Sequence, residues 1–113
     1  MSRRTARLGE ELREEVARII SSELKDPRIG FVTVTGVETS PDLRQARVFV
    51  SVLGSARKRK QSLEGLAAAH GVLQSRLARE LRMKRTPTLA FEYDPTVEEG
   101  VRMSKLIDEL VNE

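Results

Sequence analysis

The chain has 113 residues, of which 39% are hydrophobic and 33% charged, so it can build one modest core in a single soluble domain. It has no cysteine and one histidine, which excludes disulfides, iron–sulfur clusters, thiolate zinc sites and cysteine nucleophiles. The formal net charge is +3, and no apolar run approaches the roughly 20 residues that a membrane-spanning helix needs. We expect one domain over residues 1–113, with flexibility confined to residues 1–5.

The N-terminal part of the chain predicts an amphipathic helix. Apolar residues recur every three or four positions from Leu8 to Leu24, with Glu and Arg between them. Pro27 disfavours helical backbone at Asp26, so residues 25–30 are expected to form an ordered turn out of the helix. The basic N-terminus leads into charged positions and not into an apolar stretch, so it is no signal peptide, and we expect a cytoplasmic location.

Two strands are expected after this turn. Residues 31–37 are rich in β-branched side chains, and in residues 46–52 Ala and Val alternate with Arg, Phe and Ser. The short polar connection at 39–42 favours an antiparallel hairpin, and Gly36 is expected to mark a β-bulge.

A stripe of leucines predicts further helical structure from near Ser62 to Leu81. Gly71 lies in its middle, where glycine costs about 1 kcal/mol relative to alanine. We therefore expect a break at Gly71, with two helices joined by a kink. Pro87 ends this region, and residues 89–93 alternate in polarity as a third strand.

A last helix is expected at the C-terminus. Thr96 and Glu99 have the spacing of a capping box, and residues 97–111 supply an apolar side that would pack on the domain. The predicted fold class is therefore α+β, in the order α-β-β-α-(kink)-α-β-α, without internal repeats.

The charges are sorted along the chain. Residues 55–85 hold nine Lys and Arg against two Glu, a net +7, whereas residues 86–113 hold two cations against seven carboxylates, a net −5. Such polarity predicts one surface for a polyanion and another that is ordinary solvated surface.

Catalytic motifs are missing from the sequence. The seven glycines include no G-x-x-G, G-x-G-x-x-G or P-loop spacing, and there is no G-x-S-x-G or H-E-x-x-H. Carboxylate pairs such as Glu10-Glu11 fit a solvated helix face. We expect no enzyme, no metal and no cofactor.

Nucleic-acid binding is better supported by the run Arg57-Lys58-Arg59-Lys60, just before the helix expected near Ser62. Cations near a helix N-terminus oppose its dipole, so helix stability does not explain them. A loop kept soluble by charge is the alternative explanation. Few aromatics are available to stack on bases, and Phe91 fits the core better, which disfavours an RNP-type sheet reader.

The predicted order of elements resembles that of the type II KH domain, although this chain lacks the G-x-x-G loop that clamps nucleotides in KH domains. At the place of that loop it has Ala69-His70-Gly71. This alanine–any–glycine kink and several further segments resemble the bacterial ribosome-binding factor A family over nearly the whole chain. Those segments are Lys25-Asp26-Pro27-Arg28-Ile29-Gly30, Val32-Thr33-Val34-Thr35, Ser40-Pro41-Asp42-Leu43-Arg44-Gln45-Ala46-Arg47-Val48 and Pro87-Thr88-Leu89-Ala90-Phe91.

The resemblance implies a cytoplasmic assembly factor; the sequence indicates no oligomer, so we expect a monomer without catalytic activity. Such a factor binds the free 30S small ribosomal subunit and its 16S rRNA late in maturation, promotes rRNA processing, leaves before translation and is linked to growth in the cold. Other assembly factors are possible partners. The residues expected to contact RNA are Arg3, Arg4, Arg7, Arg57, Lys58, Arg59, Lys60, Ser75, Arg76, Arg79, Arg82, Lys84 and Arg85.

The remaining motifs have structural roles or stay open. Ala69 and Gly71 are expected to set the kink, and Asp26, Pro27 and Arg28 to order the turn. His70 is either partly buried with one hydrogen bond or displayed at the kink beside Ser75 and Arg76.

Lys84 and Arg85 are weaker indicators of RNA binding, because cations are favourable at a helix C-terminus. Two other functions stay open: a protein-binding α/β adaptor that uses the acidic C-terminal helix, and a nonspecific binder of single-stranded RNA.

Overall fold

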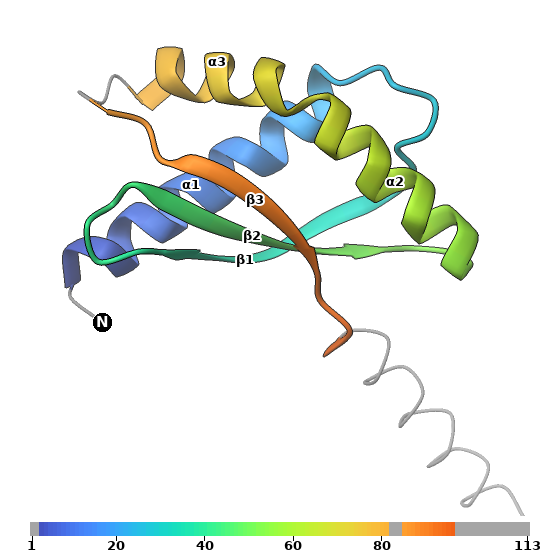
Figure 1. Cartoon of the computed structure of the whole chain (residues 1–113), viewed down its shortest axis with the longest axis horizontal. Helices are drawn as coiled ribbons and strands as arrows, with labels where there is room; N and C mark the ends of the chain where they lie inside the picture. The colour runs from blue at the N-terminus through green and yellow to red at the C-terminus, as the bar shows by residue number, and fades with distance from the viewer. Residues whose placement is uncertain (1–2, 82–84, 97–113) are drawn as a thin grey trace, which may run out of the picture.

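The fold is a three-stranded sheet with helices on one of its faces, described here from a computed structural model for residues 3–81 and 85–96 (Figure 1). The elements follow in the order α1 (Arg3–Ser22), β1 (Val32–Thr39), β2 (Gln45–Val52), α2 (Ala56–Ala68), α3 (His70–Leu81) and β3 (Thr88–Tyr93). The predicted α+β class and the order α-β-β-α-α-β are confirmed. The predicted C-terminal helix lies outside the described residues. No helix in the described ranges is long and apolar enough to cross a membrane.

Helix α1 has the amphipathic character that its spacing predicts. Leu12, Val16 and Ile19 are fully buried, in one core cluster with apolar side chains of the sheet. The helix already begins at Arg3, and the Thr5 carbonyl accepts a hydrogen bond from the Thr39 hydroxyl at 3.3 Å. The helix thus includes residues 3–5 of the segment expected to be flexible, and residues 1–2 lie outside the described residues.

The predicted hairpin and its bulge are both present. Strands β1 and β2 are antiparallel, with Val34 opposite Val50, but Gly36 and not Thr35 is opposite Phe49. This register shift lets Val34 and Val37 both face the core, whereas strict alternation would turn Val37 away from it. Strand β3 pairs with β2 in parallel, so that the sheet order is β1-β2-β3 and β3 is an edge strand.

The turn between α1 and β1 is held by Asp26 and Arg28, as expected. The carboxylate of Asp26 accepts hydrogen bonds from the guanidinium of Arg28 at 2.6 Å and from its backbone N–H at 2.9 Å. These bonds lower the pKa of Asp26 from 3.8 to about 2. The turn is joined to α2 by fully buried Ser62, whose hydroxyl accepts from the Gly30 N–H at 3.1 Å.

Acid is expected to weaken this turn. Because Asp26 titrates at about 2 in the folded chain and at 3.8 ordinarily, the unfolded chain binds more protons between these values. The stabilisation is therefore complete above about pH 5 and is lost as the pH falls toward 2. In urea unfolding over this range, Asp26→Asn should lose stability less steeply with acid than the native chain does. Equal slopes for the two proteins would contradict this role of Asp26.

The start of helix α2 and the position of the break between α2 and α3 both differ from the predictions. The first helix begins at Ala56 and not near Ser62, because the Ser55 side chain caps it by accepting from the Lys58 N–H at 3.2 Å. The predicted break exists, but it lies at Ala69, two residues before Gly71. Gly71 is in the first turn of α3 without a positive φ.

Candidate nucleic-acid interface

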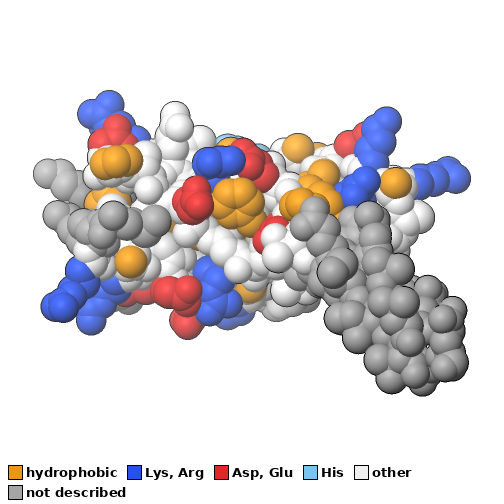
Figure 2. Space-filling view, turned by 90° about the horizontal axis from the view of Figure 1, so that it is seen from below, with side chains coloured by type: hydrophobic (Ala, Val, Ile, Leu, Met, Phe, Trp, Pro, Cys, Tyr) orange, Lys and Arg blue, Asp and Glu red, His pale blue; other side chains and the backbone are white. Residues whose placement is uncertain are grey.

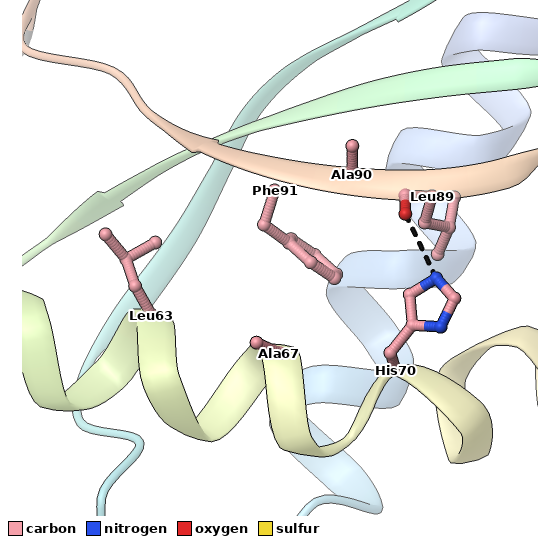
Figure 3. A pocket seen from close by; sticks show the side chains of 6 residues that line it. All are labelled: Leu63, Ala67, His70, Leu89, Ala90 and Phe91. Atoms are coloured by element: carbon pink, nitrogen blue, oxygen red, sulfur yellow. Dashed lines mark hydrogen bonds between the residues drawn. The ribbon is translucent and has the colours of Figure 1, made fainter.

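A shallow groove of about 340 Å³ lies between the helices and the edge strand β3 (Figure 3). Its helical side comes from the α2–α3 segment and its other side from β3. The groove is mostly apolar, because five of its six lining side chains are apolar and only His70 is polar. It is lined by Leu63, Ala67, His70, Leu89, Ala90 and Phe91.

Two side chains cover the first half of the β3 edge. The Nε2 of His70 hydrogen bonds to the Leu89 carbonyl at 3.0 Å (Figure 3). The amide of Gln74 donates to the Pro87 carbonyl at 3.0 Å and accepts from the Leu89 N–H at 2.7 Å. His70 is thus half-buried with a hydrogen bond, and the alternative of a fully displayed ring at the kink is wrong.

The second half of this edge faces the groove at Phe91. In a parallel ladder alternate residues direct their backbone groups to the same neighbour. Thr88 and Asp94 donate to carbonyls on the β2 side, at Arg44 and Val50. The N–H and C=O of Phe91 therefore point away from β2, into the groove, where they can pair with the polar edge of a ligand.

Phe91 belongs partly to the core, as predicted. Its ring is half-buried, packs against the core cluster and forms the floor of the groove beside Leu63 and Ala67 (Figure 3). Beyond Phe91, the Arg59 guanidinium lies 4.4 Å from the centroid of the Tyr93 ring, a cation–π contact that fixes one end of α2 to β3.

The basic run occupies the first two turns of α2, which strengthens its functional interpretation. The first turn has no acidic residue, so the helix dipole meets only unfavourable charge there. Arg57 and Lys60 are exposed, whereas Lys58 is half-buried beside Gly30 and Gly54. Arg59 differs from the other three in that its guanidinium lies over the Tyr93 ring.

Among the described residues, the other predicted RNA contacts do not form one continuous surface with this run. Figure 1 places the first turn of α2 and the last turn of α3 at opposite ends of the helical layer. On the face that the helices leave open, Lys and Arg gather at the two ends, and those near the middle lie beside Asp and Glu (Figure 2). Arg47, for example, contacts Glu92 at 2.6 Å and Glu38 at 3.6 Å.

Helix α3 and the N-terminus of α1 provide the second basic group. Arg76 is paired with Glu23 of α1 at 3.2 Å, which reduces its availability to a phosphate. The exposed members described by the structure are Arg3, Arg7, Ser75, Arg79 and Arg85. The Arg4 side chain, Arg82 and Lys84 lie outside the described part of the chain.

Reasoning from the sequence missed Gln74. The signal was available, because His70 and Gln74 are four residues apart and share one side of a helix. What the spacing did not reveal is that β3 lies opposite that side.

The sequence profile of the ribosome-binding factor A family matches residues 4–107. The chain belongs to this family. The ribosome-binding factor A of Thioalkalivibrio sulfidiphilus (strain HL-EbGR7) is 47% identical over 110 residues, which cover 97% of this chain and 85% of that protein.

Solved structures of the family have the same fold. The crystal structure of ribosome-binding factor A from Thermus thermophilus is 32% identical, with a TM-score of 0.71 over 79% of this chain and 93% of that one. A homology model of the Thermus thermophilus factor, fitted into a cryo-EM map of a 30S–RbfA complex, is 32% identical, with a TM-score of 0.68 over 80% of this chain and 96% of that one. The family's KH-like fold is thus the fold of this chain.

Proposed function

We propose that this protein is a ribosome assembly factor that binds the free 30S subunit through its 16S rRNA. The observation that carries the proposal is the run of cations in the first two turns of α2, with no carboxylate in the first turn to balance the charge. Phosphates supply that negative charge in RNA, and they are also favoured by the positive end of the helix dipole. The family membership and the 30S complex of the Thermus thermophilus relative support the choice of ribosomal RNA.

The groove beside β3 gives the second part of the interface. An apolar floor at Phe91 and Leu63 accommodates the flat face of an unpaired base, and the Phe91 backbone groups can pair with its edge. The kink Ala69-His70-Gly71 stands where a nucleotide-clamping loop lies in KH domains. We propose that the groove holds bases while Arg57, Lys58 and Lys60 hold phosphates, with the α3 and α1 cations as further phosphate contacts.

The proposed activity is conformational. A factor that binds one arrangement of immature rRNA more tightly than another shifts their equilibrium by its differential affinity, without bond chemistry. Late 30S maturation, 16S rRNA processing, release before translation and growth in the cold would depend on this shift. We further propose a monomeric, single-domain cytoplasmic protein, which has no catalytic activity and works beside other assembly factors.

Sedimentation tests the proposal directly. The purified protein is centrifuged with isolated 30S subunits, complete ribosomes and naked RNA, each at low and moderate salt. The expected result is selective co-migration with 30S subunits that weakens with salt. Equal binding to all three ligands would indicate a nonspecific polyanion binder, and no binding would favour a protein adaptor. Either of these two outcomes would overturn the proposal.

A further inference from the structure

Two large apolar side chains are exposed at the end of the β1–β2 ladder. Phe31, just before β1, is 80% exposed, and Leu53, just after β2, is 75% exposed. Both strands carry buried apolar side chains, such as Val34 and Val50. They are neighbours, because the Leu53 N–H donates to the Phe31 carbonyl at 3.0 Å just beyond the last pair of the ladder, Val32 and Val52. We call this pair the Phe31–Leu53 platform.

Cations lie in the two segments that carry the platform. Residues 28–33 and 51–60 contain five Lys or Arg and no Asp or Glu. Of these, Arg28 is paired with Asp26 and Arg59 lies over Tyr93, which leaves Arg57, Lys58 and Lys60. Lys58 lies next to it: a methyl group added at Gly30 would lie 2.6 Å from Cε and 3.5 Å from Nζ of Lys58. The Lys58 ammonium therefore lies beside the backbone of the residue that precedes Phe31.

The chemistry of this end of the molecule favours one class of ligand. A second protein that covered the platform with apolar groups would remove water from Lys58 and its neighbours without pairing their charge, which is unfavourable. Two side chains also offer far less than the roughly 800 Å² per partner of a stable protein interface. A nucleotide matches both the apolar platform and the cations beside it, because its base has a flat apolar face and its phosphate is an anion.

We propose that an unpaired base of single-stranded RNA stacks on the Phe31–Leu53 platform while Lys58, Arg57 and Lys60 bind the adjoining phosphates. This inference rests on the proposed function and adds a second base-binding position to it, at the end of the β1–β2 ladder and separate from the β3 groove. In this arrangement the cations of α2 and the exposed ring of Phe31 bind the phosphate and the base of the same RNA segment.

The test uses Phe31→Ala, Phe31→Trp and the matched control Val72→Ala, which removes a 50% exposed apolar side chain from α3. Affinity is measured for 30S subunits and for a short single-stranded RNA oligonucleotide. Loss of stacking is expected to weaken binding of both by roughly 5- to 100-fold in Phe31→Ala. Phe31→Trp and Val72→Ala should bind like the native chain.

Two further readouts separate stacking from other effects. Because Phe31 makes no phosphate contact, the salt dependence of binding should keep its slope in Phe31→Ala. The chain has no tryptophan and one tyrosine, so Phe31→Trp provides a single tryptophan that can be excited selectively. Its emission is expected to be that of an exposed indole in the free protein and to be quenched by the oligonucleotide. Thermal unfolding of all three variants should match the native chain, since these side chains are exposed.

Several outcomes would overturn the stacking proposal. One is native affinity of Phe31→Ala for both ligands. Another is weakened binding to 30S subunits alone, without quenching by the oligonucleotide, which would place a protein on the platform. A buried-type emission in the free protein would mean that the chain itself covers the platform. If the native protein fails to bind 30S subunits, the proposed function fails, and the oligonucleotide arm still decides on stacking.

Discussion

Replacing Arg57, Lys58 and Lys60 together by Gln is expected to abolish most binding to 30S subunits at moderate salt. Each cation that meets a phosphate displaces a counterion, so three lost contacts should lower the slope of log affinity against log salt by about 2 to 3. Arg59 is kept, because its guanidinium holds Tyr93 and its loss would disturb the junction of α2 and β3. Gln preserves the aliphatic part of Lys58 that packs beside Gly54.

A matched control loses the same charge elsewhere. Arg13, Arg18 and Arg44 each lie within 4.0 Å of a carboxylate, at Glu10, Glu15 and Asp42, outside the basic run. Their joint replacement by Gln should leave the salt slope nearly unchanged, since cations outside the interface displace no counterions from phosphates. A similar loss of affinity in both triple variants would show that net charge alone drives binding and would contradict a localised interface.

Substituting Ala for Gly65 and for Gly71 is expected to change stability in opposite directions. A methyl group on buried Gly65 would lie 2.6 Å from Cγ1 of Ile29, where α2 packs against the turn after α1, so part of the core must shift. Such overpacking typically costs about 1 to 3 kcal/mol. A methyl group on Gly71 meets no atom within 4 Å, and alanine suits a helix better by about 0.5 to 1 kcal/mol.

Urea unfolding of the two variants measures these changes. Removing the obstacle in the double variant Gly65→Ala, Ile29→Ala should give a smaller loss than the two single losses combined, because the residues are in contact. If Gly71→Ala destabilised the chain as much as Gly65→Ala does, glycine would be needed for the kink itself. The placement of the break at Ala69 predicts that it is not.

Much of the fold follows from local patterns. The spacing from Leu8 to Leu24 predicts α1, and the alternation in β2 predicts its buried face, because each pattern reflects which side of an isolated element must leave water. Gly36 was correctly identified as a bulge, since glycine in an alternating strand is a typical sign of one. The start of α2 was missed because the basic run hides it: Ser55 is an ordinary cap, but four cations in succession do not suggest a first helical turn.

The sequence predicted several residues of the candidate site but not how they are arranged in space. The run from Arg57 to Lys60 was visible in the sequence, and so was a break between two helices, although it was expected at Gly71 and lies at Ala69. Their relation to β3 was not, because Gln74 and Leu89 meet only after a parallel pairing that no local pattern encodes. Phe31 was expected in the first strand, whereas it lies just before β1 with its side chain in solvent.

The sequence by itself determined the identity of the elements, the family and the concentration of positive charge, because these depend on residue type and on spacing within one segment. Only the tertiary structure decided which of those residues share a surface. The parallel pairing of β3 with β2 creates the groove, the direction of the α2–α3 segment separates the two basic groups, and the end of the β1–β2 ladder brings Phe31 to Leu53. Contacts between distant segments arise from the joint burial of all the elements, and no single segment contains that information.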